Sequence, residues 1–329
     1  MSSVEASHRI AVVGAGRMGR GISLSFAFSG YPVQLIDSEE RSTGAFAELA
    51  DSVAQEVETE LQFLQRLSVV STAQAEIIAA RISVLPRSAA AAALVTVDFV
   101  FEAVAELLEV KQSTYDWLNG VLPDTAIIGS TTSTMLVDTL AEFVEVKNRF
   151  LNTHWLNPAL LMPLVEMSPG QHSDEDTVAS MKALLEGIGK QVVVCAASPG
   201  FIVPRIQALA MTEAARCVEE GVASAEEVDK AVRLGFGVRY AVLGLLEFID
   251  WGGGDILYNA TQYLAGALDD KRFSVPKIIE TNMRENRNGI RDGQGFYDYS
   301  ERDVDAYRQE RLGDFVKLLQ HLSLLPEAK

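Results

Sequence analysis

The chain has 329 residues, which is enough to bury a large hydrophobic core and favours about two domains. Its 28 basic and 45 acidic residues give a formal net charge of −17, so we expect the surface to repel nucleic acids and anionic membranes. The two cysteines predict neither a metal site nor a disulfide framework. With an early Glu5 and no long apolar run, the chain is expected to be cytoplasmic.

A glycine-rich turn follows the first expected strand. The run RIAVV at 9–13, apolar after Arg9, leads into GAGRMG at 14–19, and a helical stretch then continues to Gly30, which is expected to end it. A buried strand that enters a glycine turn and then a helix is the context that the dinucleotide-binding fingerprint requires. We therefore predict a dinucleotide site at this turn.

Each glycine of the motif has its own physical role. Gly14 permits the tight turn, Gly16 lets the backbone approach a pyrophosphate, and Gly19 allows the helix to pack closely on the strand. The N-terminus of the helix then presents free N–H groups and a positive dipole to the anion. Met18, inside the same motif, is counted with the cofactor-binding residues.

The second expected strand, residues 32–36, ends at Asp37. An acidic side chain at this place binds the ribose hydroxyls and rejects a 2′-phosphate, which favours NAD over NADP. Arg41 argues in the opposite direction, and we interpret it as a solvated residue on the following helix. NAD is thus the predicted cofactor.

The remainder of the first half alternates helical and strand patterns. Residues 39–80 are helical in pattern, and short strands are expected at 82–84, 97–101 and 126–129. Ligands of open parallel sheets bind at the carboxyl ends of strands, so the residues that follow these strands are candidate contacts. STTST at 130–134 is one such exit, although its hydroxyls can equally cap a helix.

Two later apolar runs, 150–153 and 164–167, carry His154 directly after the first and Glu166 within the second. If these runs pair as neighbouring strands, Glu166 can hold the far imidazole nitrogen, fix its tautomer and stabilise the imidazolium. The pair would then act as a general base with an orienting carboxylate. A histidine at a strand end is more often a structural hydrogen-bonding group, so the pair alone leaves both interpretations open.

After a last expected strand at 191–194 the sequence becomes helical. Ser224 and Glu227 form a capping box at the start of one of these helices. We expect an α/β Rossmann-type NAD-binding domain over residues 1–198, followed by an all-α C-terminal domain over residues 199–329. The expected helices of the second domain are 204–220, 224–234, 241–267, 276–287 and 302–323.

Four motifs together resemble the 3-hydroxyacyl-CoA dehydrogenase family. They are GAGRMGRGI at 14–22, FEAVAE at 101–106, STTST at 130–134, and HWLNP at 154–158 with Glu166. GIRDGQGFYDY at 289–299 is similar to the glycine-aromatic segment at the family's end, so the resemblance covers roughly residues 8–299. It implies NAD-dependent oxidation of an L-3-hydroxyacyl-CoA, most similar to the short-chain 3-hydroxybutyryl-CoA type. It also implies a small-molecule substrate and a homodimer whose helical domain forms the substrate cleft and the dimer contact.

The resemblance also implies roles for individual residues. It makes His154 the catalytic base and Glu166 its partner. It makes Ser133 and Asn157 hydrogen-bonding residues around the substrate oxygen and the nicotinamide. The residues that it implies near the cofactor are Glu106 and Lys111.

Three departures from the family pattern concern the substrate. Pro204 stands in GFIVPR where the family usually has an asparagine that contacts the substrate, and Arg66 is the main basic remnant of a lysine-rich turn that helps many members hold CoA. The segment GFGVRYAVLG, which contains Arg239, resembles the same segment of relatives that oxidise free hydroxy acids, such as carnitine and gulonate 3-dehydrogenases. An arginine there can clamp a carboxylate or form a surface ion pair.

Two alternatives to the acyl-CoA substrate therefore stay open. One is a dehydrogenase of a free 3-hydroxy acid on the same fold. The other is a structural, crystallin-like protein that binds NAD without turnover. The joint presence of His154, Glu166, Ser133 and Asn157 argues against the second, because a structural role does not need that set.

Overall fold

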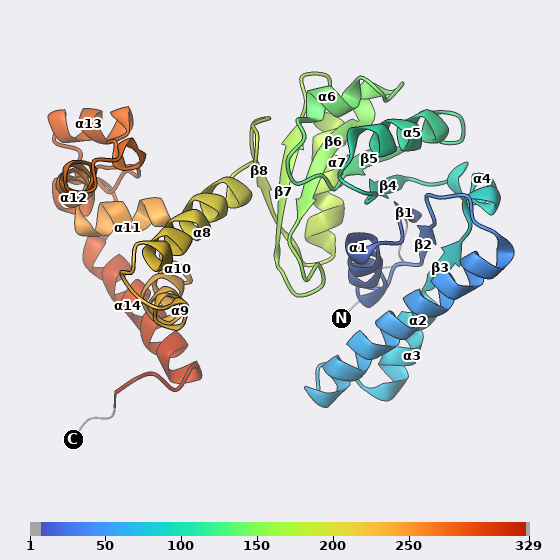
Figure 1. Cartoon of the computed structure of the whole chain (residues 1–329), viewed down its shortest axis with the longest axis horizontal. Helices are drawn as coiled ribbons and strands as arrows, with labels where there is room; N and C mark the ends of the chain where they lie inside the picture. Colours follow the sequence, from blue (N-terminus) through green and yellow to red (C-terminus); the bar gives the residue numbers. More distant parts are fainter. Residues whose placement is uncertain (1–7, 327–329) are drawn as a thin grey trace. The chain divides into compact units, whose positions relative to one another are not determined.

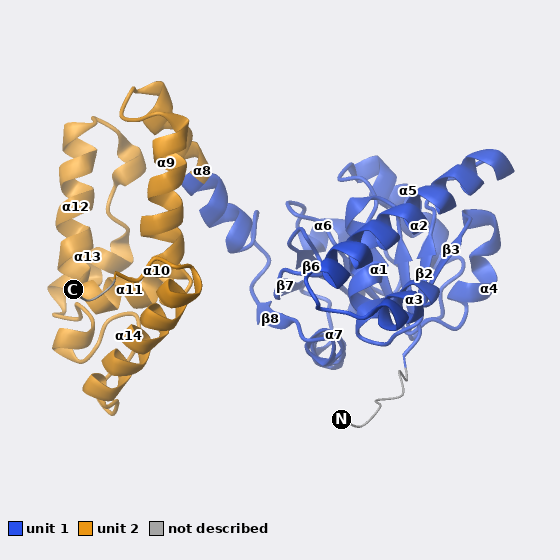
Figure 2. Ribbon diagram, turned by 90° about the horizontal axis from the view of Figure 1, so that it is seen from below, with its two compact units in different colours: residues 1–210 blue, residues 211–329 orange. Residues whose placement is uncertain are grey.

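The computed structural model describes residues 8–326, so the segment that contains Glu5 lies outside them. The chain forms two compact units, residues 1–210 and residues 211–329 (Figure 2). The division falls within helix α8, Val203–Glu219, which changes colour partway along its length in Figure 2. Sequence reasoning puts the domain boundary at 198/199, before this helix, whereas the packing assigns its first turns to unit 1.

Unit 1 is built on one eight-stranded sheet of order β3-β2-β1-β4-β5-β6-β7-β8. The pairs from β3 to β6 are parallel, β7 runs antiparallel to β6, and β8 is parallel to β7. The strands are Ile10–Val13 (β1), Val33–Ile36 (β2), Ile82–Leu85 (β3), Phe99–Glu102 (β4), Ile127–Ser130 (β5), Phe150–Trp155 (β6), Leu164–Pro169 (β7) and Gln191–Val194 (β8).

Helices cover both faces of this sheet (Figure 1). Because successive side chains of a strand point to opposite faces, Val12 packs into one core and its neighbour Val13 into the other. The first core is closed by α1, α2, α3 and α7, and the second by α4, α5 and α6. Their bounds are Arg17–Phe28 (α1), Thr43–Arg66 (α2), Thr72–Ala80 (α3), Ala91–Leu94 (α4), Leu108–Asn119 (α5), Val137–Ala141 (α6) and Glu175–Gly187 (α7).

Unit 2 is helical, as expected, but two of its predicted helix limits are wrong. Gly235 does not end a helix, because the chain continues through a π-helical turn, Val232–Gly237. The helix expected over 241–267 is interrupted at Gly253, whose φ of 110° only glycine adopts readily. The helices are Ala225–Ala231 (α9), Val238–Tyr240 (α10), Leu245–Gly252 (α11), Gly254–Ala267 (α12), Lys277–Arg284 (α13) and Val304–His321 (α14).

The glycine-aromatic segment near the C-terminus is a structural element of unit 2. The buried carboxylate of Asp250, in α11, accepts the backbone N–H groups of Phe296 and Tyr297, both at 2.9 Å. A Cβ on Gly295 would lie 2.1 Å from an oxygen of this carboxylate, so only glycine lets the segment approach it. Within residues 8–326, no helix is long and apolar enough to cross a membrane.

Candidate active site

The glycine turn between β1 and α1 has the geometry that its motif predicts. Gly14 has φ +109°, and a Cβ there would lie 2.5 Å from the carbonyl oxygen of Ala103. A Cβ on Gly19 would lie 1.8 Å from the carbonyl oxygen of Gly14. A Cβ on Gly16, by contrast, would meet no atom within 4 Å. Two glycines are therefore required by the fold, whereas Gly16 faces open space.

The N-terminus of α1 completes an anion site at this turn. Gly16 is the N-cap residue, and no side chain caps the helix. Its first N–H groups are thus left for a ligand, and the helix dipole favours a negative charge there. Met18, in the first turn of α1, is half-buried and packs against the hydrophobic core.

Asp37 follows β2, at the same sheet edge as the glycine turn, and its side chain is buried. Its Oδ1 accepts the backbone N–H of Glu39 at 3.1 Å, and its Oδ2 accepts Nε of Arg41 at 2.8 Å. Arg41 is exposed, as expected, but it does not lie on the next helix. Arg41 lies before α2, and Asp37 holds its guanidinium because the loop is short enough to bring the charges together.

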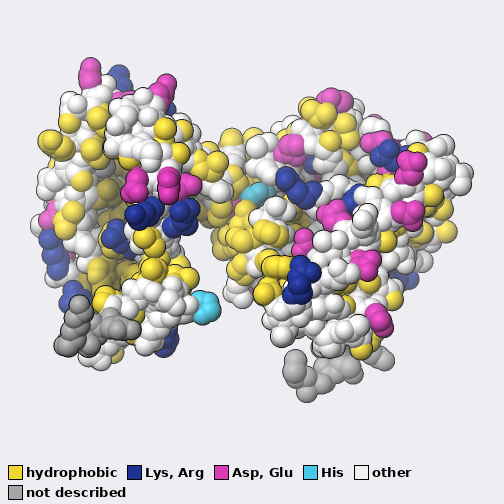
Figure 3. Space-filling model, turned by 60° about the horizontal axis from the view of Figure 1, so that its bottom comes forward, with side chains coloured by type: hydrophobic (Ala, Val, Ile, Leu, Met, Phe, Trp, Pro, Cys, Tyr) yellow, Lys and Arg dark blue, Asp and Glu magenta, His cyan; other side chains and the backbone are white. Residues whose placement is uncertain are grey.

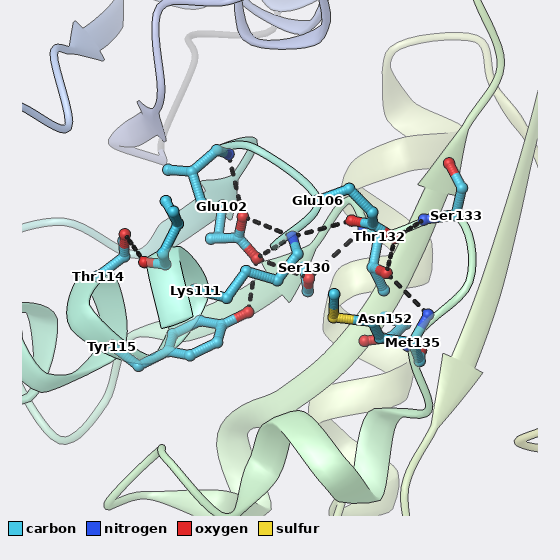
Figure 4. A network of polar contacts seen from close by, with 12 residues as sticks. Glu102, Glu106, Lys111, Thr114, Tyr115, Ser130, Thr132, Ser133, Met135 and Asn152 are labelled. Atoms are coloured by element: carbon cyan, nitrogen blue, oxygen red, sulfur yellow. Dashed lines mark hydrogen bonds and ion pairs between the residues drawn. The ribbon is translucent and has the colours of Figure 1, made fainter. Parts of the chain in front are cut away.

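Glu102 lies at the end of β4, and buried donors surround its carboxylate (Figure 4). Lys111 Nζ lies 2.8 Å and 3.0 Å from its two oxygens, Tyr115 donates its hydroxyl at 2.6 Å, and Ser130 donates its hydroxyl at 2.7 Å. Burial and the charge of Glu102 raise the pKa of Tyr115 well above its ordinary value, which keeps the phenol a donor. This network joins β4, β5 and α5 behind the sheet edge.

Glu106 holds the loop after β5 that carries Ser133. Its Oε1 accepts the hydroxyl of Thr132, the backbone N–H of Ser133 at 3.0 Å, and the N–H and hydroxyl of Thr134, each at 3.1 Å. Partial burial pushes the pKa of Glu106 upward, but the bond from Thr132, the charge of Lys111 and the bonds from Ser133 and Thr134 outweigh it. The pKa of Glu106 therefore lies below its ordinary value.

Lys111 is fully buried, and its ammonium lies between Glu102 and Glu106, 3.4 Å from Oε2 of the latter. This burial sets it apart from Glu106, which is partly exposed at the sheet edge. Both residues were predicted near the cofactor. The contacts of Lys111 indicate that it acts on this edge through Glu106, by fixing that carboxylate in place.

His154 and Glu166 form a buried pair on neighbouring strands. Antiparallel pairing of β6 and β7 places the two residues opposite each other, and His154 Nδ1 lies 2.8 Å from Glu166 Oε2. A carboxylate accepts only from a protonated ring nitrogen, so this contact puts the proton of neutral imidazole on Nδ1 and leaves a lone pair on Nε2. The expected side-by-side arrangement of the two runs is confirmed.

Two further contacts to this pair escaped sequence reasoning. The ring of Phe201 stacks on His154, with centroids 5.4 Å apart and planes at 15°. Glu166 Oε1 accepts the backbone N–H groups of Ile202 and Val203 at 2.9 Å and 2.8 Å, at the start of α8. These partners are 36 and 37 residues from Glu166, so no local pattern indicates them.

Asn157 follows β6 in a loop that a buried lysine holds. Lys190 Nζ donates to the carbonyl oxygens of Ala159 at 2.6 Å, Leu160 at 3.1 Å and Met162 at 2.9 Å. Burial lowers the pKa of Lys190. Sequence reasoning missed this residue, because the signal is only a lysine before a strand.

A cavity of about 210 Å³ adjoins the exposed Asn157. It lies between α1, α2 and the loop after β6. The charged residues in its lining are Arg17, Arg20, Glu56 and Glu60, of which Arg20 and Glu56 form an ion pair.

Most of the predicted site residues lie at one edge of the sheet, but Arg66 does not. Val13 pairs with Glu102, Glu102 with Ser130, and Ser130 with Asn152. The glycine turn and the Ser133 loop therefore follow strands that end at the edge of the sheet where His154 lies, two residues beyond Asn152 in β6. Ser133 is exposed there. Arg66 lies in the last turn of α2, 5.8 Å above the ring of Phe63, and does not line the cavity beside Asn157.

Arg239 lies in α10 of unit 2, and its guanidinium lies 4.6 Å above the ring of Phe248. No ion pair of Arg239 is found among residues 8–326, so the surface ion pair considered for it is not formed, whereas its role as a clamp for a substrate carboxylate stays a prediction. Among residues 8–326, no group of three or more histidine, cysteine and acidic side chains could hold a metal ion.

Comparison with known families agrees with this geometry. The NAD-binding domain of 3-hydroxyacyl-CoA dehydrogenases matches residues 9–198, and the C-terminal domain of the same enzymes matches residues 200–299. The chain belongs to the 3-hydroxyacyl-CoA dehydrogenase family. It is accordingly an oxidoreductase, and NAD is its cofactor. Three features of the described residues fit this cofactor. They are the uncapped N-terminus of α1, the open space beside Gly16 and the buried carboxylate of Asp37.

Individual relatives span nearly the whole chain. A 3-hydroxybutyryl-CoA dehydrogenase of Bradyrhizobium diazoefficiens is 32% identical over 88% of this chain and 95% of its own. A 5-formyl-3-hydroxy-2-methylpyridine 4-carboxylate 5-dehydrogenase of Mesorhizobium japonicum is 29% identical over 93% and 96%. The crystal structure of a 3-hydroxyacyl-CoA dehydrogenase of Archaeoglobus fulgidus superposes with a TM-score of 0.74 at 31% identity, covering 97% of this chain and 100% of that one.

Proposed function

We propose that this protein oxidises the 3-hydroxyl group of a short-chain L-3-hydroxyacyl-CoA, such as 3-hydroxybutyryl-CoA, to the 3-ketoacyl-CoA with NAD. The observation that carries the proposal is the buried contact of 2.8 Å between His154 Nδ1 and Glu166 Oε2. A relative at 32% identity is named a 3-hydroxybutyryl-CoA dehydrogenase, which supports the substrate class.

In this mechanism His154 is the general base. Its Nε2 accepts the proton of the 3-hydroxyl, and Glu166 stabilises the imidazolium that forms. NAD, when bound, supplies the acceptor for the hydride that leaves the same carbon. In the reverse direction the imidazolium returns its proton to the oxygen. Ser133 and Asn157, at the same sheet edge, are proposed to hold the substrate oxygen and the nicotinamide in position.

The variant His154→Ala tests the catalytic assignment. We expect turnover of acetoacetyl-CoA with NADH to fall at least about a hundredfold, because general acid–base catalysis contributes about 10² to 10⁴. NADH affinity, measured by calorimetry, should persist, since the imidazole does not form the glycine turn. His172→Ala is the matched control, because His172 is exposed and lies outside this site. Turnover near the wild-type rate in His154→Ala would refute the assignment.

A dehydrogenase of a small free hydroxy acid is the second candidate. The cavity beside Asn157 measures only about 210 Å³, and both Glu56 and Glu60 line it. The two glutamates balance Arg17 and Arg20 of the same lining, so this small cavity offers no net positive charge to a polyanionic ligand such as CoA. A relative at 29% identity is named as a dehydrogenase of a pyridine carboxylate, which is a free acid.

An NADH-oxidation assay separates the candidates. Acetoacetyl-CoA is compared with a panel of free keto acids, and the reverse reaction is measured with carnitine and gulonate. Turnover on the thioester supports the first proposal, and turnover on free acids alone replaces it with the second. Tight NADH binding without turnover on either panel would favour a structural, crystallin-like role.

We further propose that the protein is a homodimer through unit 2. Figure 3 shows apolar side chains on the surface of this unit. Three large apolar residues of the unit, Met211 of α8 and Ile256 and Tyr263 of α12, are each more than half exposed. Exposed apolar surface of this extent is typical of a subunit contact. Light scattering should give twice the chain mass for the wild type and a smaller mass for Ile256→Asp. A monomeric wild type would exclude the dimer.

A further inference from the structure

The adenosine corner of the cofactor site contains an arginine that sequence reasoning set aside. Asp37 follows β2 and Arg87 follows the neighbouring strand β3, so both lie at the carboxyl edge of the sheet. Arg41 lies between β2 and α2 and binds Asp37 Oδ2 through its Nε at 2.8 Å. The carboxylate that would receive the ribose hydroxyls is therefore already neutralised by a guanidinium.

One of the two carboxylate partners of Arg41 can be replaced by another anion. Its Nη2 lies 3.0 Å from the carboxylate of Glu39, whose side chain is 68% exposed. An exposed ion pair of this kind contributes little to stability, so another anion can displace it at small cost. The Nε contact with the buried Asp37 can persist while Nη2 changes partner, because the guanidinium presents its donors as a planar fork.

Arg87 adds a second positive charge to this corner. Its Nη1 donates to the carbonyl oxygen of Ser38, the residue after Asp37, at 2.9 Å. Its guanidinium lies 4.6 Å above the ring of Trp117, and Glu40 is its nearest carboxylate, at 4.0 Å. Arg87 is therefore held close to the loop that carries Arg41, although no close ion pair neutralises it.

We propose that Arg41, supported by Arg87, lets this protein bind NADP as a second cofactor beside NAD. The 2′-phosphate of NADP carries a charge of about −1.5 to −2 at neutral pH, and a guanidinium is the side chain that binds such a group best. Arg41 exchanges Glu39 for the phosphate and keeps Asp37 neutralised through Nε. With NAD bound, the same Asp37 carboxylate accepts the ribose hydroxyl.

The charges of the corner also set the order of preference. Asp37, Glu39 and Glu40 provide three negative charges, and Arg41 and Arg87 provide two positive ones. The corner is thus negative overall, so NAD binds more tightly than NADP. The inference rests on the NAD-binding domain and not on the identity of the oxidised substrate.

Calorimetry with NADH and NADPH tests the inference without any substrate. We expect the wild type to bind NADPH with a Kd within about a thousandfold of the NADH value, an energy difference of about 4 kcal/mol. In Arg41→Ala the ratio of the NADPH Kd to the NADH Kd should rise at least about tenfold, because the phosphate loses a hydrogen bond in which both partners are charged. Asp37→Asn should change the ratio in the opposite direction.

Arg9→Ala is the matched control, since Arg9 pairs with Asp98 on the surface before β1, at the other end of the strand. It should leave the ratio unchanged. If Arg41→Ala does not fold, Arg41→Lys replaces it, and the loss of the planar fork should still raise the ratio. A ratio that stays constant in the folded Arg41 variant would overturn the inference, as would a wild type that binds NADH and no NADPH.

Discussion

Replacing Lys111 with methionine removes the ammonium that contacts both oxygens of the buried Glu102 carboxylate, at 2.8 Å and 3.0 Å. Neither side chain reaches solvent, because their exposed fractions are 1% and 0%. Glu102 would keep the hydroxyls of Tyr115 and Ser130 as donors but would lose its counter-charge. Removing one partner of a buried pair costs about 3 to 5 kcal/mol, and we expect a loss in this range for unit 1.

Urea unfolding measures the loss in a Trp251→Phe background. In that background the remaining tryptophans, Trp117 and Trp155, both lie in unit 1, so their fluorescence reports that unit alone. The free energy of unfolding follows from linear extrapolation. Lys182→Met is the matched control, because Lys182 forms an exposed pair with Glu186, and we expect it to cost less than about 1 kcal/mol.

The double variant Glu102→Gln/Lys111→Met separates the unpaired charge from the lost packing. Because the buried carboxylate of Glu102 is removed with its partner and Glu106 is partly exposed, the double variant should be at least about 1 kcal/mol more stable than Lys111→Met alone. If Lys111→Met costs no more than the Lys182 control, the reasoning about this network is wrong. The same conclusion follows if the Glu102 change gives no recovery.

Three further predictions concern the sheet edge. Gly16→Ala should weaken NADH binding in calorimetry with little change in melting temperature, whereas Gly14→Ala should lower the melting temperature, since its Cβ would clash with the backbone. Because the pKa of Glu106 is lowered in the folded state, its stabilising contribution is present above the ordinary carboxyl range and is lost as the pH falls through the lowered value. Melting temperatures should accordingly fall less steeply on acidification in Glu106→Gln than in the wild type. Lys190→Met should raise the KM through the Asn157 loop, and Lys190→Arg should restore part of it; equal KM values would contradict this role.

Features that depend on neighbouring residues could be predicted from the sequence. The glycine turn is one, because Gly14, Gly16 and Gly19 act within a single strand–turn–helix unit. The strand pairing that joins His154 to Glu166 is another, because the two apolar runs are close in the chain and both are long enough to be strands. Helix ends in unit 2 were predicted less well. Gly235 was expected to end a helix but has a helical backbone, whereas Gly253 was expected inside a helix but has a positive φ that interrupts it.

The sequence by itself thus determined the family, the Rossmann-type architecture and NAD as cofactor. Only the tertiary structure decided how the site residues are held. Lys111 is buried and its ammonium contacts the carboxylate of Glu106. The ring of Phe201 stacks on His154, although the two residues lie far apart in the chain. The pairing of Arg41 with Asp37 was also decided by the fold. Such contacts depend on how distant segments and loop conformations meet in three dimensions, and residue spacing does not encode that.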